Sequence, residues 1–236
     1  MKLYHGTSAA ALPAILEKGI VPRGSRVGNF SHSVESCPEA VYLTDTYPLY
    51  FAALAAAEAD SFEGAIVEIE TDLMRDYLFN ADEDALEQAG RGGRDGLPKK
   101  WTLKRRTKHY RDQLLTTRWD WRASLKAMGT CAYMSTIRPS AITRVIVIDF
   151  QQHPRLHLAA IDASISLLNY KFCSTEHRLM TKWVFGDDPE PDEKSVWGDF
   201  LGEPAYMKEG RAGIKFVLGE GVQNGGTDGV SRIVSR

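Results

Sequence analysis

The stretch "KLYHGTS", residues 2–8, places a histidine directly after an apolar start and follows it with three small residues. An edge strand over residues 2–5 that ends in an ordinary turn accounts for this pattern, because Gly and Ser suit turns. A strand whose His5 lies on the floor of a ligand-binding cleft accounts for it as well. The stretch therefore predicts a strand at the start of the fold, and the role of His5 depends on what surrounds it.

Helix and strand patterns alternate after this stretch. Pro13 suits the first turn of a helix that ends at Gly19. Residues 65–70, "AIVEIE", alternate in a way that is typical of a strand. Similar patterns predict strands over 40–44, 129–137 and 141–150, a helix over 46–59 with Asp45 as its N-cap, and mainly helix over 155–185. This order indicates an α+β fold.

Composition limits the class of protein. The 236 residues, 43% of them hydrophobic, suffice for one domain with a sizeable core, and a net charge of -2 gives no general attraction to nucleic acid or membranes. Cys37, Cys131 and Cys173 are widely separated and have no metal-ligand spacing, so we expect neither a disulfide framework nor a metal site. No apolar run is long enough to span a bilayer. We therefore expect a cytoplasmic protein with no membrane segment.

Three segments, in order, resemble the first half of an ADP-ribosyltransferase: "LYHGTSAAALPAILEKGIVP" (3–22), "AVYLTDTYPLYFAALAAA" (40–57) and "GAIVEIE" (64–70). In that superfamily, which includes the poly(ADP-ribose) polymerases and the DarT-type nucleic-acid toxins, a strand ends in His-Gly-Thr/Ser and a second strand carries Tyr ahead of an Ala-rich helix. The match covers about the first 70 residues and continues loosely to about 150. The resemblance implies a split, mixed β-sheet cleft with peripheral helices that binds NAD.

The resemblance also implies roles for single residues. His5 would bond the nicotinamide-side ribose, the Gly6 backbone would hold the carboxamide, and Tyr42 would stack on the nicotinamide ring. These types suit the chemistry, because cleaving the nicotinamide–ribose bond mainly requires that the sugar is oriented and the leaving ring is held. In addition, Thr7 would support the ribose, Tyr50 would make a second ring contact, and Arg23 and Arg26 would contact phosphates.

One expected carboxylate is missing. Many members of the superfamily carry a Glu on a late strand near the ribose, and the position that aligns with it here, around residues 131–133, holds none. The resemblance leaves three possibilities. A base comes from elsewhere, with Glu68 or Glu70 as candidates, or the enzyme works without a Glu, or the site is inactive.

A basic segment at 99–126 suggests the target. It contains ten basic side chains against two acidic ones, a local net charge of +8, and Trp101, Tyr110, Trp119 and Trp121 lie among them. A surface that neutralises phosphates and stacks bases needs these residue types, although a solvated helix face would share the charge. The residues expected to contact nucleic acid are Lys104, Arg105, Arg106, Lys108 and Arg111.

These observations predict an organisation and a function. Residues 1–150 would form an NAD-binding core with a helical basic insertion at about 71–126, residues 151–218 a helical extension packed on it, and residues 219–236 a mobile tail. We expect a toxin-like, NAD-dependent ADP-ribosyltransferase that modifies a base in RNA or DNA and has an antitoxin or inhibitor protein as a partner. An RNA 2'-phosphotransferase, a protein-directed transferase and a catalytically silent binding module are the alternatives.

Overall fold

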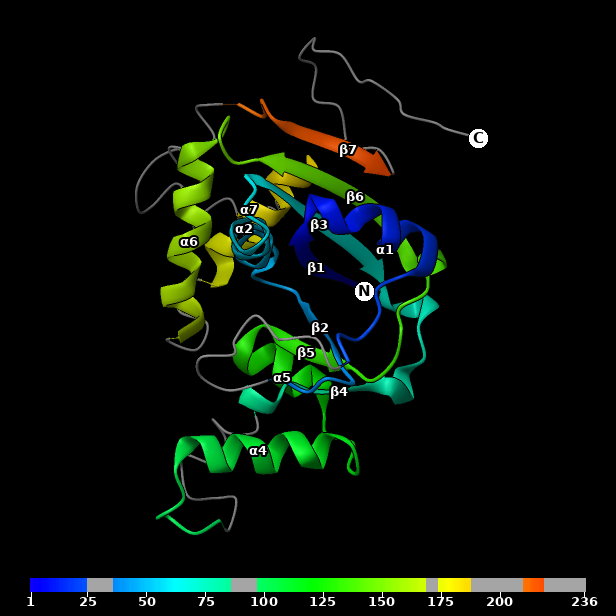
Figure 1. Ribbon diagram of the computed structural model, residues 1–236, viewed down its shortest axis with the longest axis vertical. Helices are drawn as coiled ribbons and strands as arrows, with labels where there is room; N and C mark the ends of the chain where they lie inside the picture. The colour runs from blue at the N-terminus through cyan, green and yellow to red at the C-terminus, as the bar shows by residue number, and fades with distance from the viewer. Residues whose placement is uncertain (25–35, 86–96, 169–173, 188–209, 219–236) are drawn as a thin grey trace.

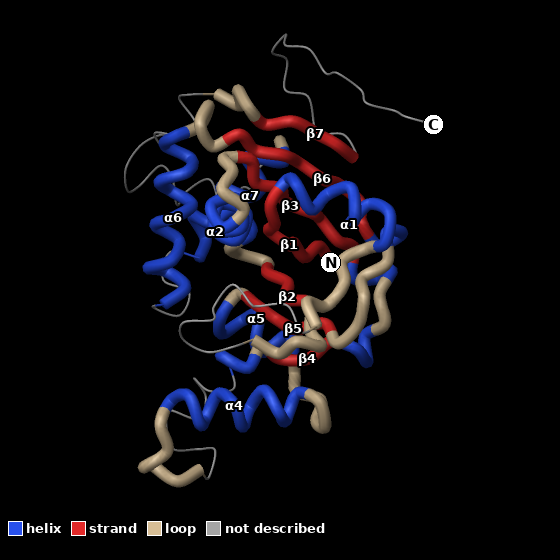
Figure 2. The backbone as a smooth tube through the Cα atoms, viewed as in Figure 1, coloured by secondary structure: helices blue, strands red, loops and turns tan. Residues whose placement is uncertain are grey.

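The computed structural model describes residues 1–24, 36–85, 97–168, 174–187 and 210–218 of the chain. It is an α+β fold built on one open sheet of seven strands in the order β4-β5-β2-β1-β3-β6-β7 (Figure 2). The strands are β1 (Lys2–Ser8), β2 (Val41–Thr44), β3 (Glu63–Glu70), β4 (Phe79–Ala81), β5 (Thr130–Tyr133), β6 (Ile142–Asp149) and β7 (Ile214–Leu218). The α+β class expected from the sequence is confirmed.

Helices cover both faces of the sheet (Figure 1). They are α1 (Leu12–Lys18), α2 (Pro48–Glu58), α4 (Leu103–Leu114), α5 (Trp121–Met128), α6 (Pro154–Leu168) and α7 (Ser174–Phe185). Leu3, with alternate residues of the neighbouring strands, packs in one core with α1 and α5. Tyr4, which points to the other face, packs in a second core with α2, α6 and α7. Among the described residues no helix has both the length and the apolar character needed to cross a membrane.

The sheet is weakly joined between β1 and β2. Seven residue pairs connect β1 to β3, from Lys2 opposite Glu70 to Ser8 opposite Gly64. In the described part of the chain a single pair, Tyr4 opposite Thr44, connects β1 to β2. The sheet therefore consists of two parts, β4-β5-β2 and β1-β3-β6-β7. We call their meeting point, from His5 on β1 to Tyr42 on β2, the β1–β2 junction.

The expected mixed sheet is wrong, because each strand pair in the described residues is antiparallel. Both β2 and β3 are antiparallel to β1, so they run parallel to each other while β1 lies between them. The crossover helix α2 connects these two strands. A helical crossover of this kind usually joins parallel strands. Here the two parallel strands, β2 and β3, are not neighbours in the sheet, because β1 lies between them.

Several boundaries differ from those expected. The turn expected after His5 is wrong, since β1 continues to Ser8 along β3. The N-cap expected at Asp45 is also wrong, because Thr44 Oγ1 accepts the backbone N–H groups of Thr46 and Tyr47 ahead of α2. The segment 71–126 is not only helical, as it contributes β4, and the segment 151–218 contributes β7. The expected tail at 219–236 lies outside the described residues.

Gly6 allows α2 to lie directly against β1. A Cβ atom at this position would lie 2.4 Å from the Pro48 carbonyl oxygen and 2.5 Å from the Ala52 nitrogen. Both contacts are with backbone atoms, which cannot move without shifting the helix. Gly6 is therefore required by packing, whatever its backbone does for a ligand.

We expect Gly6→Ala to lower the free energy of unfolding by about 3 kcal/mol, the upper part of the usual range for overpacking a core. Urea unfolding followed by circular dichroism measures the change. Gly24→Ala is the matched control, since a Cβ there meets nothing within 4 Å although its φ is +59°. The control substitution should lower the free energy of unfolding by only about 1 kcal/mol, because it places a Cβ on a left-handed backbone. Equal losses in the two variants would contradict the packing explanation.

Candidate active site

His5 and Tyr42 contact each other across the β1–β2 junction. Nδ1 of His5 lies 3.1 Å from the carbonyl oxygen of Tyr42. A carbonyl only accepts hydrogen bonds, so Nδ1 carries the proton and donates it. Burial lowers the pKa of His5, which favours the neutral ring. Nε2 of the neutral ring then holds a lone pair that can accept a hydrogen bond from a hydroxyl group.

The Tyr42 hydroxyl is held by a buried carboxylate. It donates to Glu83, whose Oε1 and Oε2 lie 2.7 and 2.6 Å away, and it accepts the Cys37 backbone N–H at 2.8 Å. Glu83 is 2% exposed. Burial, followed by the neighbouring Asp82, raises the pKa of Glu83 to about 8. Sequence reasoning missed Glu83, because β4, the strand that precedes it, is only three residues long.

The remaining β1 residues of the candidate site lie just beyond the pair that joins β1 to β2. Gly6 and Thr7 are paired with Ile66 and Ala65 on β3. Both are partly buried. Their position beside His5 agrees with the ligand contacts expected for them, and those contacts stay predictions.

Arg23 and Tyr50 make other contacts. The Arg23 guanidinium donates to the Ser36 carbonyl at 2.6 Å, which braces the segment leading to β2. Tyr50 lies on α2 with its ring centroid 5.3 Å from that of Phe51. Their expected roles toward phosphate and nicotinamide stay predictions, and Arg26 lies outside the described residues.

Glu68 and Glu70 are held in ion pairs. Glu68 is 1% exposed and accepts from Arg144 Nε at 2.9 Å. His5 is paired with Val67, so the Glu68 side chain points to the opposite face of the sheet. Glu70 accepts from the amino group of Met1 at 2.8 Å. This arrangement does not support either residue as the missing base.

The basic residues expected to bind nucleic acid lie on α4. Lys104 and Arg105 are exposed, and the Arg105 guanidinium lies 4.1 Å from the Trp101 ring centroid. The other three are partly engaged, since Arg106 donates to the Pro98 carbonyl, Lys108 pairs with Asp112 at 2.7 Å, and Arg111 lies 3.8 Å from Asp112. Lys104 and Arg105, at the start of α4, are therefore the two exposed cations of the five for which the described residues show no ion pair.

Two of the four aromatic residues of this segment are in the core. Tyr110 and Trp121 are 4% and 3% exposed, and Trp121 stacks on Phe79 of β4 at 4.4 Å. Our interpretation of Tyr110 and Trp121 as part of a base-stacking surface is wrong, because both rings are buried in the protein. Trp119 is partly buried, and its indole N–H has no acceptor within the described residues.

Helix α4 lies against the Tyr42 side of the junction. Leu114, near its end, is buried with Cys37 and Ala132, and Tyr42 and Trp119 pack against the same cluster. Figure 1 shows α4 beyond β4, at the end of the sheet farthest from β7. The basic helix and the candidate site thus share one hydrophobic cluster.

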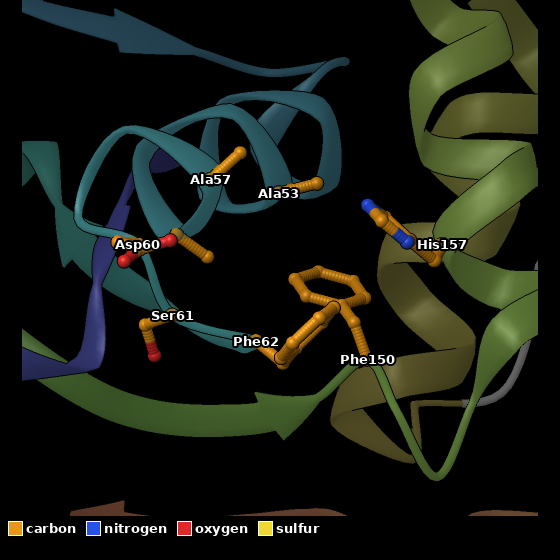
Figure 3. Close-up of a pocket in the computed structure, with 8 residues that line it drawn as sticks. Ala53, Ala57, Asp60, Ser61, Phe62, Phe150 and His157 are labelled. Atoms are coloured by element: carbon orange, nitrogen blue, oxygen red, sulfur yellow. The ribbon is translucent and has the colours of Figure 1, made fainter.

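A separate hollow lies on the α2 and α6 side of the fold. Its lining residues include Ala53 of α2, His157 of α6, and the rings of Phe62 and Phe150 (Figure 3). The His157 and Phe150 ring centroids are 5.1 Å apart. The hollow contains neither His5 nor Tyr42, so it is distinct from the candidate site.

Comparisons with known proteins identify no family. No family model matches the sequence, and neither does any curated protein. Among solved structures, the chain is similar to Thermosipho africanus DarTG in complex with ADP-ribose, with 19% identity and a TM-score of 0.32. The match covers 68% of this chain and 47% of that one, so the chain spans about half the length of DarTG. A similarity this distant assigns no function.

Proposed function

We propose that the chain is an ADP-ribosyltransferase that uses NAD as its co-substrate and modifies a nucleic-acid base. The observation that carries this proposal is the hydrogen bond from His5 Nδ1 to the Tyr42 carbonyl, at the point where β1 and β2 separate. The His5 ring, with a free acceptor nitrogen, bonds there to the Tyr42 backbone, and the His5 and Tyr42 side chains are both partly buried. These are the groups needed to hold a ribose and a nicotinamide ring.

The residues at the junction suit NAD. Neutral His5 offers Nε2 to a ribose hydroxyl while its Nδ1 stays bonded to the Tyr42 carbonyl. The Tyr42 ring is electron-rich and suits the positively charged nicotinamide. The indole N–H of Trp119, which has no acceptor in the described residues, gives the same hydrophobic cluster a spare donor. When bound, NAD supplies the glycosidic bond that breaks, and the protein orients the sugar for attack.

The exposed cations of α4 support a nucleic acid as the acceptor. The exposed cations Lys104 and Arg105 belong to a helix that packs against the cluster containing Tyr42. A nucleic-acid strand that binds this helix through its phosphates would therefore pass close to the junction. A base acts as acceptor only when it is unstacked or single-stranded. We extend the proposal to a toxin-like, cytoplasmic protein with an antitoxin or inhibitor partner, as the resemblance implies.

The proposal is tested with NAD labelled in its adenylate phosphate, incubated with purified protein and separate pools of DNA, RNA and cell protein. The expected result is label in DNA or RNA. Label found only in protein would mean that the acceptor is a protein, and the proposed use of NAD would stand. Removal of a 2'-phosphate from RNA would favour the phosphotransferase alternative. Intact NAD in all pools would contradict the proposed activity.

Reversing the charge of Lys104, Arg105 and Arg106 to Glu should weaken nucleic-acid binding across sequences. Each lost phosphate contact lowers the slope of log affinity against log salt by roughly one unit. Fluorescence anisotropy with single-stranded DNA and RNA at several salt concentrations measures both effects. The control reverses Lys18 and Arg155, two exposed cations on α1 and α6. If both variants retain the wild-type slope, α4 does not bind nucleic acid.

A further inference from the structure

A carboxylate that the sequence did not reveal lies at the candidate site. Glu83 follows β4, and β4 pairs with β5, which in turn pairs with β2. The register aligns Asn80, Ala132 and Tyr42 across these three strands. This alignment carries the chain after β4 to the hydroxyl end of Tyr42.

Glu83 bonds to the Tyr42 hydroxyl, and so does the backbone of Cys37 in the segment before β2. Both carboxylate oxygens lie within 2.7 Å of the Tyr42 hydroxyl. The Cys37 N–H donates to that hydroxyl and lies 3.3 Å from Glu83 Oε1. These contacts fix the direction of the Tyr42 ring, since they restrain its far end.

We propose that Glu83 is the positioning carboxylate of the site, which holds the Tyr42 ring in the orientation that receives nicotinamide. It acts through Tyr42 and not on the reacting atoms. The proposal rests on the proposed function for the identity of the ligand. The contact between Glu83 and Tyr42 can be tested with no ligand present.

The surroundings of Glu83 argue against a simple stabilising role. In the described part of the chain, the charged groups that act on Glu83 are the acids Asp82 and Asp84 on its own segment, and Glu39 lies beside the Cys37 thiol on the segment before β2. A buried carboxylic acid among other acids is unfavourable unless it makes specific hydrogen bonds. The raised pKa of Glu83 favours its protonated form. Glu83→Gln imitates that form, whereas Glu83→Ala removes the contact.

The first test needs no NAD. We expect the Cζ signal of ¹³C-labelled Tyr42 to shift with pH around a midpoint near 8 in the wild type. Glu83→Gln should abolish this transition. Asp84→Asn, which changes the exposed neighbouring acid, should retain it. A transition that persists in Glu83→Gln, or none in the wild type, would overturn the coupling.

The second test is a double-mutant cycle on NAD affinity at pH 7, measured by calorimetry. Glu83→Ala and Tyr42→Phe should each weaken binding by roughly fivefold to tenfold, the usual effect of one lost hydrogen bond. The double variant should lose no more than either alone, and Glu83→Gln should stay within about twofold of wild type. Losses that multiply in the double variant, or a wild-type affinity in Glu83→Ala, would overturn the positioning role. Absence of NAD binding by the wild type would instead overturn the proposed function, and the pH titration would still decide whether Glu83 acts on Tyr42.

Discussion

Replacing Tyr42 with Ala is expected to weaken NAD binding by about tenfold to a hundredfold, the range for losing one ring stacked on an aromatic side chain. The reason is the position of the ring, partly exposed at the β1–β2 junction and held by His5 at its backbone and Glu83 at its hydroxyl. Calorimetric titration with NAD measures the loss. Tyr77→Ala is the control, because Tyr77 is 60% exposed and belongs to the short helical turn before β4.

A general loss of structure in Tyr42→Ala would imitate this result, because Glu83 also loses its partner. Thermal unfolding of the variant distinguishes the two effects. Tyr42→Phe, which keeps the ring, should bind NAD more tightly than Tyr42→Ala. If Tyr42→Ala is folded and binds as well as wild type, nicotinamide does not stack on this ring.

The second large effect concerns stability. Glu68→Ala should lower the free energy of unfolding by about 3 kcal/mol, because it leaves a buried arginine without one of its two carboxylate partners. Arg144 donates to Glu68 on β3 and to Asp187 after α7, at 2.9 and 2.7 Å for the Nε and Nη1 contacts. The guanidinium also lies 4.6 Å from the Phe185 ring centroid. This network ties the sheet to α7.

Urea unfolding of Glu68→Ala measures this loss, and Glu70→Ala provides a matched control on the same strand and the same face. The Glu70 side chain is 28% exposed and pairs with the amino group of Met1, which is 48% exposed. An exposed pair of this kind contributes at most about 1 kcal/mol. Similar losses in the two variants would contradict the buried network, and loss of NAD binding in a folded Glu68→Ala would reopen Glu68 as a site residue.

The sequence predicted the elements whose patterns are local. Alternation within β3, Pro13 at the start of α1 and the Ala-rich run of α2 each depend on neighbouring residues. The strands β4 and β7 were not predicted. β4 has three residues, too few for alternation to appear, and it is a strand because β5 pairs with it.

The candidate site was predicted only in part for the same reason. His5 and Tyr42 were found because both lie in a motif that can be seen along the chain. Glu83 lies 41 residues from Tyr42, and only the alignment of β4, β5 and β2 brings the two together. Nothing in its local sequence distinguishes Glu83 from the acids on either side.

Tyr110 and Trp121 were wrongly expected to stack on bases, because the basic segment was interpreted from its overall composition and not from the helical spacing of its residues. Tyr110 and Leu114 are spaced four apart on α4 and both are buried, which is the pattern of a helix with one apolar face. Lys104, Arg105 and Lys108 lie on the rest of its surface. Helical spacing therefore separates the core residues of α4 from its exposed cations, and overall charge does not.

Because NAD is proposed to bind at the β1–β2 junction, the most direct measurement locates the ligand on the protein. NMR signals of the His5 and Tyr42 rings are followed during titration with NAD, with His157 in the separate hollow as an internal control. We predict that His5 and Tyr42 shift together along one saturation curve while His157 stays unchanged. Saturating NAD that shifts His157 alone, or that shifts none of the three rings, would contradict the account.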